Sequence, residues 1–70
     1  MQRIPVQSSN IRSVGYDPDE GLLEVEFMSG SIYEYSGVPQ RAYEAFAAAH
    51  SHGRHHRERI ANAYPFRRVK

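Results

Sequence analysis

The side chains of this chain that could do chemistry are concentrated in its last third. Residues 50–70 carry six Lys or Arg residues against a single acid, Glu58, a balance of +5, although the whole chain has a formal net charge of only +1. Residues 1–49 carry three arginines against seven acids, a balance of −4. Such an uneven distribution suits one end of the molecule to an anionic partner. The same segment holds all four histidines: His50, His52, His55 and His56.

Aromatic residues interleave with the arginines toward the end of the chain. Guanidinium groups bind phosphate bidentately, and aromatic rings stack on unpaired bases. The sequence therefore predicts a surface for RNA or another polyanion, formed by these residues: Arg54, Arg57, Arg59, Tyr64, Phe66, Arg67 and Arg68. The alternative is a solvated helix face followed by a charged tail, since the pI of 8.2 lies below the value of about 9 that is typical of nucleic-acid-binding domains.

The histidine spacing raises the question of a metal site. His52 and His56 are four residues apart, a separation that places two imidazoles on one helix face. The chain has no cysteine, and the nearest acid, Glu58, falls on a different face, so the ligand set is incomplete. We therefore expect no metal and no other cofactor. Protonation of the histidines in mild acid would instead make this end more cationic and the binding of a polyanion dependent on pH.

Patterns typical of catalysis are missing from the chain. No serine lies in a nucleophile elbow, and the glycines are too scattered to form a phosphate loop. Glu24, Glu26 and Glu34 alternate as on the solvated face of a sheet. We expect no catalytic residue and no enzyme activity. Without a signal peptide or an apolar run of about 20 residues, we expect a cytoplasmic protein that does not enter a membrane.

Three strand-like segments precede the basic third, at residues 11–16, 23–27 and 31–35. Asp17-Pro18-Asp19-Glu20-Gly21 between the first two has the composition of a turn. The second segment alternates apolar and charged residues, as a half-buried strand does. Together they predict an antiparallel meander.

The loop at Ser29-Gly30 decides what the tyrosines of the third strand do. A two-residue loop places Glu26 opposite Tyr33, whereas a three-residue loop with Gly30 as a bulge residue places Val25 there. We favour the bulge, because it gathers the apolar side chains of both strands, with Tyr33 and Tyr35, where a helix covers them. Its cost is that Ile32 lies on the open face among the glutamates.

Two short helices are predicted after the strands. Pro39 suits the first turn of a helix whose apolar stripe is Tyr43, Phe46, Ala47 and His50. Ser51 suits the N-cap of a second helix, although Gly53 could instead end the first. One face of the second helix carries His52, His56, Ile60 and Ala63. Residues 66–70 are expected to form an extended tail. The expected fold is thus a single α+β domain over residues 1–70, with a three-stranded β-meander and two short helices packed on one face.

This pattern resembles the KTSC domain family, small domains also found at the C-terminus of some lysyl-tRNA synthetases. The carriers span nearly the whole chain: Pro5-Val6, Ser8-Ser9-Asn10-Ile11, Val14-Gly15-Tyr16, Leu23-Glu24-Val25-Glu26-Phe27, Gly30, Tyr33-Glu34-Tyr35, Val38-Pro39, Tyr43, Ser51, Gly53, Ile60 and Tyr64-Pro65. The resemblance implies a stand-alone bacterial or phage-type domain of uncharacterised function, for which RNA binding has been suggested. It brings no catalytic residues.

One segment departs from the family pattern. Where similar sequences tend to carry an aromatic pair and then an asparagine, this chain has His55, His56 and Arg57. If His56 replaces a core aromatic residue, its imidazole needs a hydrogen-bond partner.

The hypothesis that follows is a non-catalytic binding module whose basic C-terminal third contacts RNA or another polyanion. The alternative is a protein-interaction module or homodimer. It would use the acidic open sheet face, with Ile32 exposed at its centre, or an unpaired strand edge.

Overall fold

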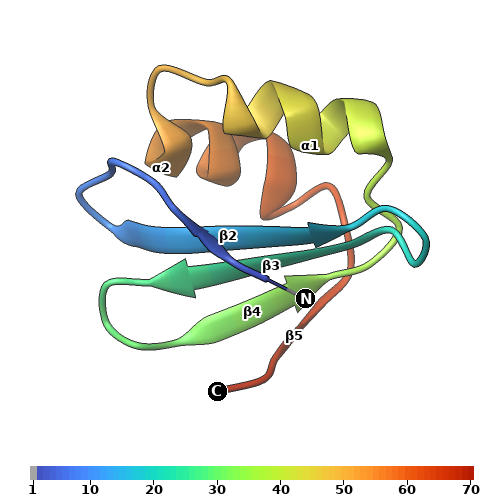
Figure 1. Ribbon diagram of the computed structural model, residues 1–70, viewed down its shortest axis with the longest axis horizontal. Coiled ribbons are helices and arrows are strands. Elements are labelled where there is room, and N and C mark those ends of the chain that lie inside the picture. Colours follow the sequence, from blue (N-terminus) through green and yellow to red (C-terminus); the bar gives the residue numbers. More distant parts are fainter. Residues whose placement is uncertain (1) are drawn as a thin grey trace.

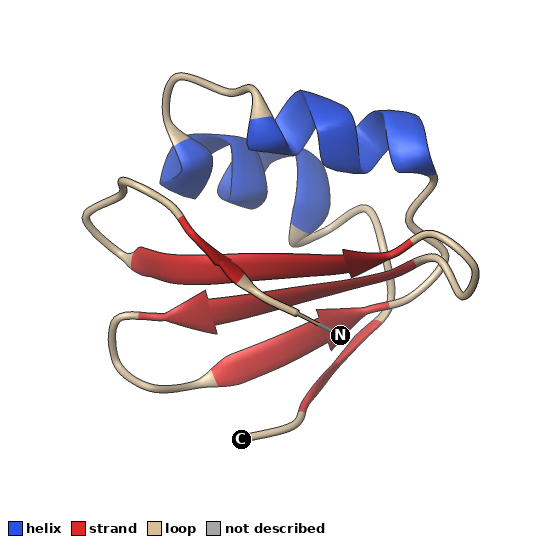
Figure 2. Cartoon of the chain, in the orientation of Figure 1, coloured by secondary structure: helices blue, strands red, loops and turns tan. Residues whose placement is uncertain are grey.

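The computed structural model describes residues 2–70, which form one antiparallel sheet with helices over one of its faces (Figure 1). The strands keep their sequence order in space: β1 (Ile4–Pro5), β2 (Ile11–Asp17), β3 (Leu22–Phe27), β4 (Ile32–Tyr35) and β5 (Phe66–Arg68). Helix α1 (Gln40–Ala47) is followed by α2 (His52–His55), which continues directly into the π-helix η1 (His56–Ile60) (Figure 2). Within the described residues, no helix combines the length and apolarity needed to cross a membrane.

The predicted meander is present as β2, β3 and β4, but the prediction of three strands is wrong because the sheet has five. β1 pairs with β2, and β5 pairs with β4, so the expected extended tail is an edge of the sheet. With two and three residues, these strands are too short to show an alternating pattern. Their position is set by distant backbone groups; for example, the Ile32 N–H donates to the Lys70 carbonyl at 3.1 Å.

The bulged register of the second hairpin is confirmed. Tyr33 lies opposite Val25 and Tyr35 opposite Leu23. The Phe27 N–H donates to the Ser31 carbonyl at 2.9 Å, which leaves three loop residues between them. The last loop residue is Gly30 with φ +96°, a conformation that side chains with a Cβ rarely adopt. The register therefore places the apolar side chains of β3 beneath the helices, as expected.

The expectation that Ile32 is exposed on the open face is wrong, since only 6% of the residue is accessible. The reason is β5, which the sequence did not reveal. The Val69 N–H donates to the Ile32 carbonyl at 2.8 Å, so the end of the chain runs beside Ile32 and makes it an interior position of the sheet.

Helix α1 covers the sheet through Phe46, which is fully buried, and Tyr43, which stacks on Tyr16 with ring centroids 4.6 Å apart. The predicted stripe is correct for these two residues and wrong for Ala47 and His50, which are exposed. The helix ends at Ala47, so the periodicity that included His50 runs past the last helical turn.

Ser51 is the N-cap of the second helix, as predicted, and its Oγ accepts from the Arg54 N–H at 3.2 Å. Gly53 lies inside this helix and does not end the first. At η1 the hydrogen bonds widen, and the Ala61 N–H donates to the His56 carbonyl at 2.8 Å. The π-turn holds one more residue than an α-turn, which shifts the buried face. Ile60 remains buried, but Ala63 is exposed beyond the helix, so its predicted place on that face is wrong.

His56 faces the sheet, where its Nε2 lies 2.6 Å from the hydroxyl oxygen of Tyr35. Its ring is edge-on to Phe27 at 5.2 Å and to Tyr35 at 5.4 Å. Burial lowers the pKa of His56 below the ordinary value of 6.5. Burial, with a contribution from neighbouring Tyr33, raises the pKa of Tyr35 to about 12. The two groups are therefore a neutral hydrogen-bonded pair at neutral pH, and Tyr35 is the partner that a buried imidazole requires.

This pair predicts a specific pattern of stability changes. Tyr35→Phe leaves the His56 ring without its partner and lowers the free energy of unfolding by about 1–3 kcal/mol. His56→Phe strands the Tyr35 hydroxyl in the same way. In the double variant the free energy of unfolding falls by less than the sum of the two single decreases, because neither polar group is then left unpaired. Urea denaturation measures all four proteins, and additive losses would contradict the coupling.

The lowered pKa of His56 also predicts a pH dependence. The unfolded chain binds this proton more readily than the folded protein does, so the stability from the neutral imidazole is fully present above about pH 6.5. It is lost as the pH falls below that value toward the folded-state pKa. Between about pH 7.5 and about pH 5, the free energy of unfolding falls more steeply in the wild type than in His56→Phe. Equal slopes would show that His56 is not responsible.

Candidate anion-binding cleft

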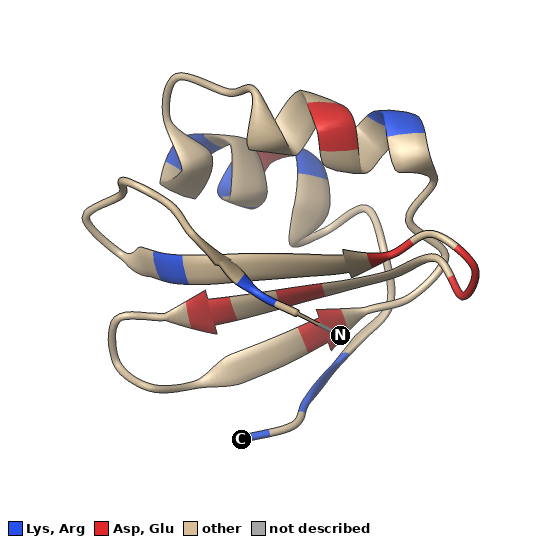
Figure 3. Ribbon diagram, viewed as in Figure 1, with Lys and Arg blue, Asp and Glu red and all other residues tan. Residues whose placement is uncertain are grey.

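A polar cleft of about 470 Å³ lies where the loop before β2 meets the start of α2. Residues 7–10 form one wall, and residues 50–54 with Arg57 form the other. The ionisable side chains of these walls are His50, His52, Arg54 and Arg57, and none of the lining residues is acidic. In Figure 3 the basic residues of this helical segment lie in the helical layer, apart from the acidic residues on the strands of the sheet. The cleft is thus suited to an anion.

Two local features fix the walls of the cleft. Ser8 Oγ accepts from the Asn10 and Ile11 N–H groups at 3.3 Å and donates to Asn10 Oδ1 at 3.0 Å, which closes the loop on itself. Across the cleft, Gly53 is buried, and a Cβ atom at this position would overlap the side-chain amide of Asn10. Glycine at position 53 therefore allows the loop and the helix to approach closely.

The two cleft arginines keep most of their donors free. Arg54 donates from Nε to Glu58 Oε2 at 3.1 Å, which leaves both terminal nitrogens of its guanidinium group without a hydrogen-bond partner in the described chain. The side chains of this pair are 70% and 51% exposed. Arg57 forms no ion pair with any of residues 2–70. Since Arg54 and Arg57 are three residues apart on one helical segment, both can reach a single anion.

The other predicted binding residues lie elsewhere. Arg59 and Tyr64 line a separate hollow between α1 and η1, together with Glu58. Arg67 and Arg68 lie on β5, where Arg67 Nε donates to Glu34 Oε1 at 3.1 Å and Arg68 Nε donates to the Lys70 carbonyl at 3.0 Å.

The predicted set is therefore divided among three places. The cleft holds Arg54 and Arg57, the hollow holds Arg59 and Tyr64, and the sheet edge holds Phe66, Arg67 and Arg68.

The histidines are equally dispersed. His50 is exposed at the cleft, whereas the His52 ring is edge-on to buried Phe46 with its Nε2 3.2 Å from the Ala47 carbonyl oxygen. The His55 ring also packs against Phe46, at 5.8 Å. Over residues 2–70, no three His, Cys, Asp or Glu side chains are placed to share a metal ion.

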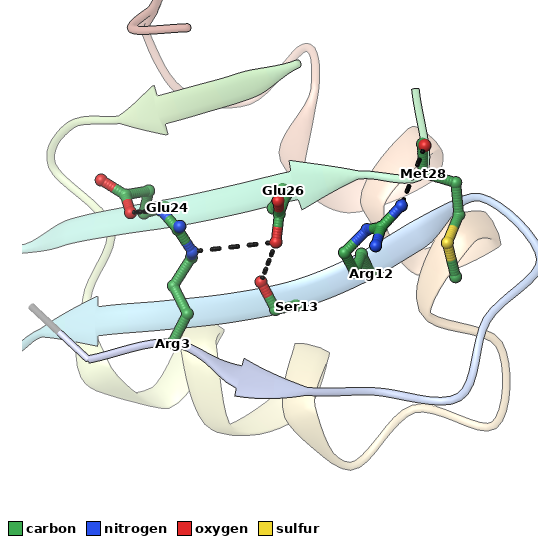
Figure 4. A network of polar contacts seen from close by, with 6 residues as sticks. All are labelled: Arg3, Arg12, Ser13, Glu24, Glu26 and Met28. Atoms are coloured by element: carbon green, nitrogen blue, oxygen red, sulfur yellow. Dashed lines mark hydrogen bonds and ion pairs between the residues drawn. The ribbon is translucent and has the colours of Figure 1, made fainter. Parts of the chain in front are cut away.

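The open face of the sheet is less acidic than its sequence indicates (Figure 4). Arg3, beside β1, forms an ion pair with Glu24 and lies 4.0 Å from Glu26. Ser13 Oγ donates to Glu26 at 2.8 Å, and Glu34 is paired with Arg67. The two features that favoured a protein partner on this face, free carboxylates and an exposed Ile32, are therefore not found.

Sequence reasoning missed the loop wall of the cleft, because Ser8-Ser9-Asn10 has the composition of an ordinary turn. A usable signal was nonetheless present. Ser8, Asn10, Ser51 and Gly53 all belong to the pattern that carries the family resemblance, and the structure brings these distant residues together at one cleft.

Comparisons with known proteins agree with this pattern. The model of the KTSC domain matches residues 7–64. An uncharacterized protein of Stutzerimonas stutzeri is 51% identical over 55 residues, which cover 79% of this chain and 78% of that protein. A protein of Tsukamurella paurometabola is 44% identical over 50 residues, which cover 71% of this chain and 75% of the relative.

Two further matches extend over more of the chain. A lysine–tRNA ligase of Nostoc punctiforme is 33% identical over 63 residues, which cover 90% of this chain but only 11% of the ligase. The crystal structure of a KTSC domain protein from Yersinia pestis superimposes with a TM-score of 0.95 at 43% identity, over 99% of this chain and 97% of that one. On the strength of the family match and the shared fold, the chain belongs to the KTSC domain family.

Proposed function

We propose that this protein is a non-catalytic RNA-binding domain that holds RNA phosphates in the cleft between the Ser8–Asn10 loop and α2. The observation that carries the proposal is the charge of the cleft, whose ionisable side chains are all basic and whose lining includes no acid. An anion placed there would meet two guanidinium groups without repulsion from a carboxylate in the wall. Arg54 and Arg57 are the residues that would neutralise it.

The chemistry of the cleft fits phosphate in particular. A guanidinium group presents a planar fork of donors that matches two phosphate oxygens, and such charge-assisted bonds are about twice as strong as neutral ones. The loop wall adds neutral polar groups from Ser8, Ser9 and Asn10. Phosphate contacts of this kind fix the position of a nucleic acid without reading its sequence.

The comparisons favour RNA among the polyanions. A segment similar to this chain occurs in a lysine–tRNA ligase, a protein named for joining lysine to tRNA. That segment covers only 11% of the ligase. We infer that the domain supplies RNA affinity, and that this copy does so in the cytoplasm of a bacterium.

The proposal predicts RNA binding that weakens with salt. For a single strand, log K falls with log salt with a slope of about −0.7 for each neutralised phosphate. Fluorescence anisotropy of a labelled single-stranded RNA at about 50 mM and about 200 mM salt measures the slope. Arg54→Gln/Arg57→Gln should weaken binding about tenfold at the lower salt and reduce the slope by about 0.7 units if the two arginines hold one phosphate, or by about 1.4 units if they hold two.

Two controls separate the cleft from the net charge. Arg12→Gln/Arg41→Gln removes the same charge from β2 and α1 and should bind RNA nearly as well as the wild type. Glu58→Gln releases Arg54 from its ion pair and should tighten binding. Equal losses in the two double variants would show that net charge alone attracts RNA, and no binding by the wild type at low salt would overturn the proposal.

A further inference from the structure

A second surface feature lies on β5, far along the sequence from the cleft. Phe66 is 54% exposed. Every other Phe or Tyr among residues 2–70 is buried or half-buried. An exposed phenylalanine forgoes most of the stabilisation that burying its ring would give. Contact with a ligand would explain why this ring is exposed at the edge of the sheet.

Aromatic contacts hold the Phe66 ring in position. It stacks on Tyr33 with centroids 5.3 Å apart and planes 20° apart, and it lies 5.6 Å from the Tyr35 ring. Tyr33 is in turn edge-on to Phe27, and Tyr35 is bonded to His56. The ring is thus connected to the core on one side while more than half of the residue is open to solvent. A ring fixed in this way loses little conformational freedom when a ligand binds.

A cation accompanies this ring. Arg68 is two residues after Phe66 on β5, so the two side chains share a face of the strand. Arg68 lies opposite Tyr33, the residue that supports the Phe66 ring. Its Nε donates to the Lys70 carbonyl at 3.0 Å, which leaves its terminal nitrogens available. Among the residues that the structure places in register with β5, the one carboxylate is that of Glu34, which pairs with Arg67 on the other face of the strand.

We propose that Phe66, supported by Tyr33, stacks on an unpaired base of a single-stranded nucleic acid, and that Arg68 contacts the adjoining phosphate. The inference rests on the proposed RNA binding and adds to it a preference for single strands. A base in a duplex is stacked on both sides and cannot lie on a protein ring, whereas an unpaired base can. The charges beside the ring favour this ligand over an apolar segment of a protein partner.

The test compares Phe66→Leu, which keeps an apolar side chain but removes the aromatic face, with Phe66→Trp, which keeps that face. Anisotropy is measured with a single-stranded RNA and with a duplex of the same sequence. The Phe66→Leu variant binds the single strand about tenfold more weakly than the wild type, because one base–aromatic stacking contact is lost. Its affinity for the duplex is unchanged. Phe66→Trp binds the single strand at least as well as the wild type. Thermal unfolding confirms that each variant is folded at the assay temperature.

Val69→Ala is the matched control, because Val69 is another exposed apolar residue of the same segment, at 41%. The salt slope distinguishes the two proposals. The slope is unchanged in Phe66→Leu, which loses no phosphate contact, and it is reduced in Arg54→Gln/Arg57→Gln.

Three results would overturn the inference. If Phe66→Leu binds the single strand as tightly as the wild type while Arg54→Gln/Arg57→Gln still weakens binding, stacking by Phe66 is refuted. The proposal that the cleft binds RNA is then unaffected. Absence of RNA binding by the wild type refutes both proposals. Intact RNA binding in Phe66→Leu together with loss of a dimer in sedimentation would assign the ring to contact with a second copy of the chain.

Discussion

The hydrogen bond between Tyr35 and His56 joins the two layers of this small domain at the point from which both candidate surfaces extend. Tyr35 belongs to β4, and its ring also contacts Phe66 on the edge strand. His56 is the first residue of the π-helix and follows directly on α2, which carries Arg54. A chain of about 70 residues buries only about 60% of its unfolded surface, so a single satisfied polar contact inside it has a large effect on stability. Loss of this bond would therefore loosen the cleft and the sheet edge together.

The fold partly cancels the charge asymmetry of the sequence, because it pairs acidic and basic residues from different parts of the chain. Acids from the first part of the chain meet arginines from both ends on the open sheet face, where Glu24 and Glu34 are paired with Arg3 and Arg67. Exposed pairs of this kind contribute little to stability, about 0–1 kcal/mol each. Their larger effect is on the field around the molecule, because they neutralise the sheet face. The basic side chains without an acidic partner among residues 2–70 lie in both layers, and of these Arg57 lies at the cleft.

The sequence allowed the central architecture to be predicted because the relevant signals are local. Gly30 fixes a three-residue loop and hence the register of β3 and β4, and Ser51 marks the start of α2. The edge strands could not be predicted. The residues of β5 pair with backbone groups of β4 that are 30 or more positions away in the sequence. Strand β1 has only two residues, and one of them is Pro5. The π-turn was equally hidden. No residue type requires it, and only the hydrogen bond from the Ala61 N–H to the His56 carbonyl reveals it.

The position of the candidate site could not be predicted from the sequence. The arginines of the last third were predicted to bind phosphate, yet their nearness in sequence does not bring them together, because η1 and β5 diverge after Ile60. What assembles the cleft is a contact between distant parts of the chain, Asn10 against Gly53, and only the fold shows it.

The division between supporting and binding residues follows from the small size of the domain. Arg54 and Arg57 are exposed and have little role in packing, so the core does not dictate which residue type stands at these positions. Gly53, Ser51 and Ser8 form the walls through the close approach of the backbone and through local hydrogen bonds, so they are constrained by geometry instead. A surface loop and the first turn of a helix, both held by a compact sheet, can therefore change their ligand while the core stays the same.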